Sequence, residues 1–194
     1  MIFVDGIVKV RFCGKVVIQL THAFFCYNKG CMFRHRRIKI LERKSQIELT
    51  NMCLICDGTR ILVEEKRGTS YPGGLIFPGG HVEKNESLRD SVIREIKEET
   101  GLTIRNPKLC GVKDWIEKDG TRYLVLLYKT NEFEGELKSS EEGRVFWLER
   151  KDVLQANLIW NMRELLEIFD TDDYSEFFFR DDEKVRPGRR NLLG

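Results

Sequence analysis

The sequence predicts an α/β protein whose main domain begins near residue 47, with a charged tail at residues 181–194. Two patterns support this class: short apolar runs bounded by turn residues, which are typical of strands, and two segments with apolar residues at helical spacing. A length of 194 residues suits one domain with an appendage, and 41% hydrophobic residues exclude general disorder. No apolar run approaches the roughly 20 residues that span a bilayer, so a membrane protein is not expected.

The elements of the main domain can be placed from these patterns. In chain order we expect a hairpin of Met52–Cys56 and Ile61–Glu65, a short strand in Leu75–Gly80, a helix from Ser87 to Glu99, strands at Leu109–Ile116, Tyr123–Thr130 and Val145–Leu148, and a helix at Leu158–Phe169. Gly101 is expected to cap the first helix, because glycine tolerates the left-handed conformation found there. Cys53 and Cys56 are three residues apart in a strand and point to opposite faces, which favours buried thiols over a redox pair.

Charge divides the chain into a basic front and an acidic body. Residues 1–47 carry ten Lys and Arg against two acidic residues, a net charge of +8, whereas residues 48–194 carry a net charge of −6. A basic segment can contact nucleic acid or anionic lipid nonspecifically. A solvated arm without a function is the favoured interpretation, so nucleic acid is not expected as a partner.

The sequence leaves the structure of this basic extension, residues 1–46, open. Ile7–Phe12 and Val16–Leu20 alternate as strands of a hairpin do, but a disordered arm fits as well. So does a read-through segment before a start at Met32 or a non-Met start near Leu41. A zinc site is not favoured, because the only ligand run (Cys26, Cys31, His35) has three members at an unusual spacing.

Cysteine usage and the first residues bear on the compartment. Six cysteines in 194 residues are too few for a disulfide scaffold, and charged residues interrupt any hydrophobic stretch among the first twenty. Free thiols in a reducing cytoplasm are therefore expected. The chain is expected to be a monomer or a homodimer.

The helix that follows Gly80 carries the chemistry. Glu95, Glu98 and Glu99 are spaced i, i+3 and i+4, so their carboxylates share one helix face. Such a cluster is either solvated surface or a site for a divalent cation, and oxygen-only ligands favour Mg²⁺ or Mn²⁺ over zinc. Arg94 can pair with Glu98 or hold Glu86 beside the cluster.

The full spacing resolves that choice in favour of a site. The chain has Gly80, five residues, Glu86, seven residues, and then the run Arg94 to Leu102. It thereby resembles the Nudix hydrolases from about residue 47 to about 179, since it fills all nine specified positions of their box, G-x5-E-x7-R-E-U-x-E-E-x-G-U, where U is apolar: Gly80, Glu86, Arg94, Glu95, Ile96, Glu98, Glu99, Gly101 and Leu102.

The resemblance implies a Nudix α/β/α sandwich with a mixed sheet over residues 47–180 and a hydrolase that uses Mg²⁺ or Mn²⁺. It implies a catalytic set of Glu95, Glu98 and Arg94, with Glu95 as the general base and Glu98 as the alternative. The implied metal ligands are Glu95, Glu98, Glu99, the carbonyl of Gly79, and Glu142, with Glu141 a less favoured choice for the last. A cation would also reverse the negative charge that repels a pyrophosphate from the acidic body.

The resemblance extends to the MutT-like branch, whose members are described as 8-oxo-dGTP diphosphatases that release a nucleoside monophosphate and pyrophosphate. By position Asn157 is a candidate reader of an oxidised purine, although a helix N-cap fits that residue equally well. Phe77 and Trp115 are further candidates for substrate binding. Tyr123, Phe146 and Trp160, like Trp115, are residue types that stack on a base but are commoner in the core.

Other functions stay open. The nucleotide substrate could instead be ADP-ribose or a dinucleoside polyphosphate. A nucleotide-binding module without catalysis is disfavoured, because the chain keeps every glutamate of the box. An RNA-end hydrolase that uses residues 1–46 as a binding arm is a third possibility.

Overall fold

The structure is a computed structural model, and it describes residues 45–66 and 73–179 together with the backbone of five short strands elsewhere. The chain forms two compact units, Met1–Arg43 and Lys44–Gly194. In the first unit four antiparallel strands form a sheet in the order β1-β2-β3-β4, with β1 (Ile2–Val4), β2 (Ile7–Phe12), β3 (Lys15–Leu20) and β4 (Ala23–Cys26). In this sheet β2 pairs with β3, which corresponds to the hairpin alternative for the extension. Cys31 and His35 of the zinc alternative lie outside the described residues.

The described residues of the second unit form three helices and two sheets. The helices are α1 (Leu88–Thr100), α2 (Arg150–Val153) and α3 (Met162–Asp170). The strands are β5 (Ile47–Asp57), β6 (Arg60–Lys66), β7 (Leu75–Ile76), β8 (Thr103–Arg105), β9 (Lys108–Ile116), β10 (Arg122–Thr130), β11 (Glu132–Glu134), β12 (Gly143–Glu149), β13 (Glu176–Phe178) and β14 (Leu192–Leu193). No helix in the described residues is long and apolar enough to cross a membrane.

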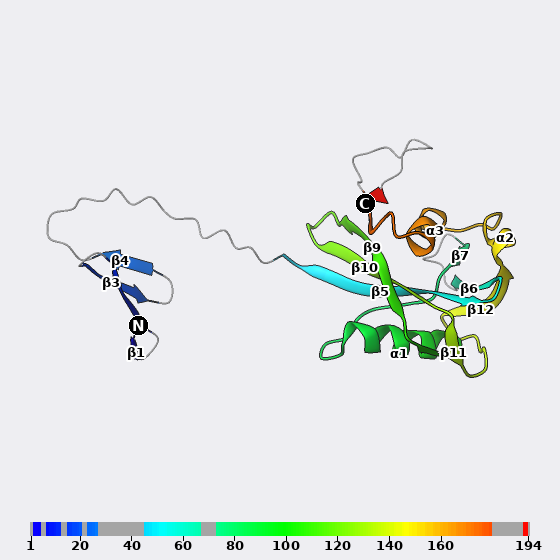
Figure 1. The fold of residues 1–194 in the computed structure, drawn as a ribbon, viewed down its shortest axis with the longest axis horizontal. Helices are drawn as coiled ribbons and strands as arrows, with labels where there is room; N and C mark the ends of the chain where they lie inside the picture. Colours follow the sequence, from blue (N-terminus) through cyan, green and yellow to red (C-terminus); the bar gives the residue numbers. More distant parts are fainter. Residues whose placement is uncertain are drawn as a thin grey trace. The chain divides into compact units, whose positions relative to one another are not determined.

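The main sheet is mixed, as predicted. Its order is β12-β6-β5-β10-β9-β13-β14, with β7 paired to β6, and β8 and β11 form a separate two-stranded sheet. β5 runs parallel to β10 and β13 parallel to β9, while the other neighbours are antiparallel. Figure 1 shows α1 on one face of this sheet and α3 on the other, which is the three-layer α/β/α arrangement.

Each face of the sheet buries its own apolar core. The core on the α1 side contains Cys53, Val92 and Ile96, and the core on the α3 side contains Leu54 and packs against Cys56. The two cysteines therefore lie on opposite faces, as their spacing predicts. The thiols described (Cys53, Cys56 and Cys110) are all free.

The first predicted helix is confirmed at both ends. Ser87 caps it by accepting a hydrogen bond from the backbone N–H of Asp90, and Gly101 ends it in the left-handed conformation, with φ of 75°. Because both signals are local, the sequence places this helix to within one residue at each end.

The predicted start of the last helix is wrong. We expected Leu158, but α3 begins at Met162, because Trp160 and Asn161 have φ of 53° and 64°. Two left-handed residues outside glycine cannot be read from a helical pattern. Asn157 is consequently not the N-cap of this helix; that position is held by Asn161, whose side chain makes no capping bond.

Candidate active site

The glycine loop is held directly against β5. The backbone N–H groups of Asn51 and Cys53 donate to the carbonyls of Gly80 and Pro78 at 2.8 and 2.9 Å. β5 consequently pairs with β6 only at its far end, through Cys56 and Asp57. The loop thus enters the sheet between these two strands and brings its glycines beneath α1.

Neither Gly79 nor Gly80 has room for a side chain. A Cβ on Gly80 would overlap the carboxylate of Glu95, and a Cβ on Gly79 would overlap the carbonyl of Asn51. Gly79 also has a φ of +154°, which side-chain-bearing residues rarely adopt. Its carbonyl is not one of the acceptors for β5, which leaves the predicted metal-ligand role of that carbonyl a prediction.

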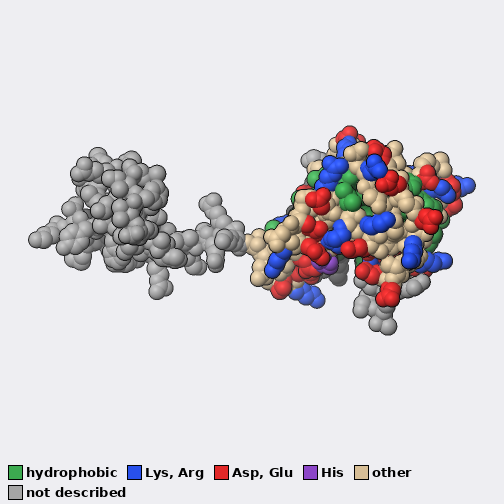
Figure 2. All heavy atoms as spheres, turned by 90° about the horizontal axis from the view of Figure 1, so that it is seen from below, with side chains coloured by type: hydrophobic (Ala, Val, Ile, Leu, Met, Phe, Trp, Pro, Cys, Tyr) green, Lys and Arg blue, Asp and Glu red, His purple; other side chains and the backbone are tan. Residues whose placement is uncertain are grey.

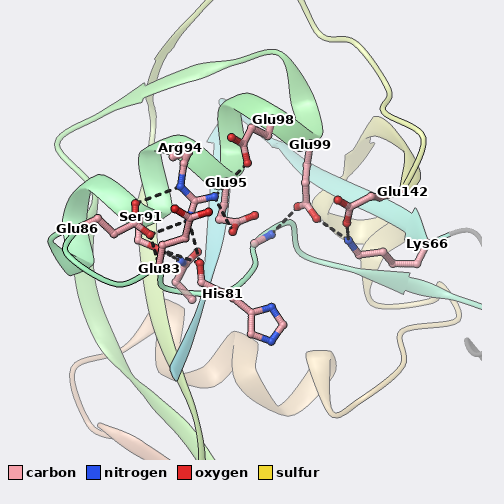
Figure 3. A network of polar contacts seen from close by, with 12 residues as sticks. Lys66, His81, Glu83, Glu86, Ser91, Arg94, Glu95, Glu98, Glu99 and Glu142 are labelled. Atoms are coloured by element: carbon pink, nitrogen blue, oxygen red, sulfur yellow. Dashed lines mark hydrogen bonds and ion pairs between the residues drawn. The ribbon is translucent and has the colours of Figure 1, made fainter. Parts of the chain in front are cut away.

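Packing of α1 fixes the direction of its acidic face. Val92 and Ile96 are fully buried against the sheet, and Ser91 accepts a 2.8 Å hydrogen bond from the Asn51 side chain on β5. With that face buried, Glu95 and Glu99 are directed to the glycine loop, as Figure 3 shows.

Arg94 is the centre of the first of two polar networks (Figure 3). Its guanidinium donates two hydrogen bonds to Glu86, of 2.7 and 3.1 Å, and one each to Glu95 at 2.9 Å, Glu98 at 3.0 Å and the His81 carbonyl at 3.0 Å. The hydrogen bonds from Arg94 lower the pKa of Glu86 to about 2. A planar donor with five N–H groups can hold several carboxylates at once.

Lys66 is the centre of the second network. Its ammonium lies 2.5 Å from Glu99, 3.1 Å from Glu142 and 3.3 Å from the fully buried Glu64, and the N–H of Gly79 donates to Glu99 at 2.8 Å. Burial, together with the nearby charge of Glu64, raises the pKa of Glu99 to about 7. An ionised Glu99 is therefore only partly compensated within the protein.

Four carboxylates near the glycine loop form a donor set that fits a divalent cation. The carboxylates of Glu95, Glu98, Glu99 and Glu142 border one cavity, and carboxylate oxygens are the ligands that Mg²⁺ and Mn²⁺ prefer. Within the described residues no three acidic, His or Cys side chains converge in a metal-holding geometry; these four carboxylates make ion pairs with Lys66 and Arg94.

A cleft of about 900 Å³ joins the carboxylates to an apolar and aromatic region. We call these its acidic end and its aromatic end; the latter is lined by Lys113, Trp115, Tyr123, Val125, Trp160, Asn161, Met162 and Phe179. The rings of Trp115 and Tyr123 are stacked, with centroids 4.3 Å apart. Figure 2 shows acidic and basic side chains interspersed over the α1 side of this unit.

The structure sorts the predicted substrate-binding residues. Phe77 and Trp115 line the cleft, and so does Glu142, whereas Glu141 borders a second, smaller pocket. Asn157 does not line the cleft: its side-chain amide donates to the Gly73 carbonyl at 3.2 Å.

The stacking candidates are also divided. Tyr123 and Trp160 join Trp115 in the cleft, while Phe146 packs against the core, with the Arg144 guanidinium 4.8 Å from its ring centroid. Because Phe146 packs against the core and does not line the cleft, it is not a candidate for stacking on a base.

The sequence analysis missed several residues of the site, and three polar ones matter most for its chemistry. Lys66 and Lys113 each lie on a strand, and Asn161 precedes α3. Lys113 could have been found from the sequence, because residues two apart in a strand, such as Lys113 and Trp115, point to the same face of the sheet. Lys66 and Asn161 depend on long-range packing, which no local pattern indicates.

Comparison with known proteins agrees with this geometry. The family model of the NUDIX domain matches residues 48–169. An uncharacterised Nudix hydrolase of Bacillus subtilis, YvcI, is 37% identical over 110 residues, which cover 54% of this chain and 67% of that protein. An ADP-ribose pyrophosphatase of Methanocaldococcus jannaschii is 31% identical over 86 residues, which cover 44% of this chain and 51% of that protein.

Among solved structures, a MutT protein from Bacillus halodurans superposes with a TM-score of 0.59 at 27% sequence identity. The match covers 76% of this chain and 95% of that one. The region that the family model matches includes both the glycine loop and α1.

Proposed function

The chain belongs to the Nudix family and is a hydrolase of pyrophosphate bonds, and from this premise we propose that it cleaves a nucleoside triphosphate to a nucleoside monophosphate and pyrophosphate. The proposed substrate is 8-oxo-dGTP or a related oxidised nucleotide. The observation that carries the proposal is one cleft, of about 900 Å³, that joins a wall of carboxylates to an aromatic region. Its similarity to a MutT protein supports the same choice.

Glu95, Glu98, Glu99 and Glu142 would hold Mg²⁺ or Mn²⁺ at the acidic end. A divalent cation there supplies charge neutralisation for phosphate oxygens and a lower pKa for a coordinated water. Arg94 keeps Glu95 and Glu98 on the same side of the cleft. Glycines at positions 79 and 80 let phosphate oxygens approach the backbone, because no side chain covers it.

The chemical step is a substitution at phosphorus. Glu95, or Glu98 in its place, accepts a proton from the attacking water. A new oxygen–phosphorus bond then forms as the bond to the bridging oxygen breaks, and the bridging oxygen leaves with the released pyrophosphate. Both proposed bases border the cleft, with side chains 14% and 61% exposed, so water can reach them.

The aromatic end would receive the base. Trp115, stacked on Tyr123, offers a flat apolar surface of the kind on which bases stack. Phe77 is fully buried and forms part of the cleft wall. Asn157 is not part of this proposal, because its amide is bonded to Gly73 outside the cleft.

A second candidate substrate is ADP-ribose. It is favoured by the 31% identity to the ADP-ribose pyrophosphatase of Methanocaldococcus jannaschii, although the match covers only half of that protein. The acidic end would act in the same way on either substrate, so the two candidates differ in what occupies the rest of the cleft.

A substrate panel tests the proposal. The full chain is incubated with 8-oxo-dGTP, dGTP and ADP-ribose, with Mg²⁺ or Mn²⁺, and phosphate and pyrophosphate are measured separately. We expect pyrophosphate and a monophosphate from 8-oxo-dGTP and no turnover in chelator. A preference for ADP-ribose would replace the proposed substrate, and tight binding without turnover of any compound would contradict catalysis. The same panel run with Glu98→Gln identifies contaminating phosphatases.

A further inference from the structure

Lys113 is a buried cation at the aromatic end of the cleft. It lies on β9, its residue is 7% exposed, and its ammonium donates a 2.6 Å hydrogen bond to the backbone carbonyl of Trp160. The same nitrogen is 5.3 Å from the ring centroid of Trp115. It therefore faces the surface on which the base is proposed to stack.

This cation lacks an ionic partner in the described part of the chain. No described carboxylate lies within 4.0 Å of its nitrogen, unlike the two cations of the acidic end, which make several ion pairs each. Burial lowers the pKa of Lys113 to about 8, and the more distant Glu164 offsets only part of that effect. A buried charge without a partner destabilises a fold, and such costs are found mainly at functional sites.

A purely structural role explains only part of this arrangement. The Trp160 carbonyl needs one donor, which a neutral side chain would supply without the cost of a buried charge. An ammonium has three N–H donors and no acceptor. With one donor used by the backbone, the group is suited to a ligand atom that only accepts hydrogen bonds.

The edge of a base offers such an atom in some nucleotides and not in others. Guanine and hypoxanthine carry a carbonyl oxygen at position 6, and oxidation at position 8 leaves that oxygen in place. Adenine carries an amino group there, which is a donor. A lysine donor facing this edge would therefore favour guanine and hypoxanthine over adenine.

We propose that Lys113 is a specificity-determining residue that donates a hydrogen bond to the 6-carbonyl of a purine stacked at the aromatic end, so that the site selects 6-oxopurine nucleotides over adenine nucleotides. This inference rests on the proposed nucleotide hydrolase function, and it distinguishes the two candidate substrates. Oxidised guanine nucleotides satisfy the lysine, whereas ADP-ribose, an adenine nucleotide, does not.

The test measures binding as well as turnover. Dissociation constants for GMP, IMP and AMP are determined by calorimetry on the full chain, as wild type, Lys113→Met and Lys113→Arg. Met retains the length and apolar stem without a donor, and Arg retains a donor. IMP separates the carbonyl from the 2-amino group of guanine. Lys108→Met, on the same strand but with its side chain 71% exposed, is the matched control.

We expect wild type to bind GMP and IMP at least about 10-fold more tightly than AMP, as for a buried, base-specific hydrogen bond. Lys113→Met should weaken GMP and IMP binding about 10–100-fold and AMP binding less than about 3-fold. Lys113→Arg should recover part of the preference, and Lys108→Met should match wild type. Thermal unfolding verifies that each variant is folded.

Three results would overturn the inference: no preference for 6-oxopurines in wild type, an equal loss for all three nucleotides in Lys113→Met, or no nucleotide binding at all. An equal loss would point to a phosphate contact. The ratio of kcat/KM for GTP to that for ATP separates this inference from the proposed function. Turnover without base selectivity rejects only the role of Lys113, whereas selective binding without turnover rejects only the hydrolase.

Discussion

The two ends of the cleft differ in how many partners surround a buried charged side chain. At the acidic end, Glu99 is 3% exposed, yet it receives hydrogen bonds from Lys66 and from the backbone of Gly79. At the aromatic end, Lys113 is 7% exposed and has one backbone acceptor. At the acidic end the carboxylates lie in a network with Lys66 and Arg94 that compensates them in part, while at the aromatic end the cation is proposed to find its partner in a ligand.

In the proposed function, the acidic end carries out catalysis and the aromatic end determines which substrate is preferred. Removing a carboxylate from the acidic end should change the rate for every substrate, because all of them are proposed to be cleaved there. Changing the aromatic end should alter which substrate is preferred.

The largest effect is expected for Glu98→Gln. The substitution removes a proposed metal ligand and base, so kcat should fall by about 1,000-fold for every nucleotide tested. Because the Glu98 side chain is 61% exposed, the melting temperature should change little. Steady-state kinetics and thermal unfolding check both parts, and Glu136→Gln, an exposed loop residue, is the control. A normal rate would refute the assignment of Glu98.

The two ends should also show opposite pH dependence of stability in the metal-free protein. Between pH 4.5 and 7 the folded state binds a proton at Glu99 that the unfolded state has lost, because the pKa is raised from 4.5 to about 7. The free energy of unfolding should therefore fall by about 3 kcal/mol as the pH rises through this window. Urea unfolding of wild type and Glu99→Gln checks this, since the variant should lack the decline.

Lys113 should produce the reverse trend at higher pH. Its pKa is lowered from 10.5 to about 8, so between pH 8 and 10.5 the unfolded state binds the extra proton. The free energy of unfolding should rise by about 3 kcal/mol across that window in wild type and not in Lys113→Met. At pH 7 the variant should be the more stable protein. A flat difference between the two would mean that the ammonium is solvated.

A smaller effect is expected for Arg94→Lys. Lysine keeps the charge but cannot hold Glu86, Glu95 and Glu98 together, so kcat should fall about 10-fold without a change in base preference. The ratio of kcat for GTP to kcat for ATP measures the second part. Arg89→Lys, an exposed position on the same helix, is the matched control. A shifted base preference would show that the two ends are coupled.

The smallest effect is expected for Asn157→Ala. Its amide contacts Gly73 outside the cleft, so the loss should be one exposed hydrogen bond, about 0.5–1 kcal/mol of stability, with base preference unchanged within about 2-fold. Binding of GMP and AMP checks the preference. A loss of preference in this variant would restore Asn157 as the base reader and weaken the case for Lys113.

Local signals explain what could be predicted from the sequence. The helix α1 has a serine cap, a glycine cap and a box of fixed spacing, and it forms as expected. The acidic end follows from it, because side chains three and four apart share a helix face. In α3 the same apolar pattern extends too far back, since nothing local reveals the left-handed Trp160 and Asn161.

The aromatic end could not be predicted in the same way. Lys113 on β9, Tyr123 on β10 and Asn161 before α3 meet only because the strands pair and α3 covers that face of the sheet. Their roles depend on burial and on distances between elements, which a single sequence does not specify. The boundaries at residues 46 and 180, and the role of the basic extension, stay predictions.

The glycine loop also has a consequence for solubility during folding. The N–H groups of Asn51 and Cys53 lie on a long apolar strand, and they are satisfied by the loop rather than by a neighbouring strand. Without the loop, β5 would present an open edge to other chains, the usual starting point of aggregation. The glycines that let the loop lie against β5 would then protect the folding chain from association as well as shape the proposed active site.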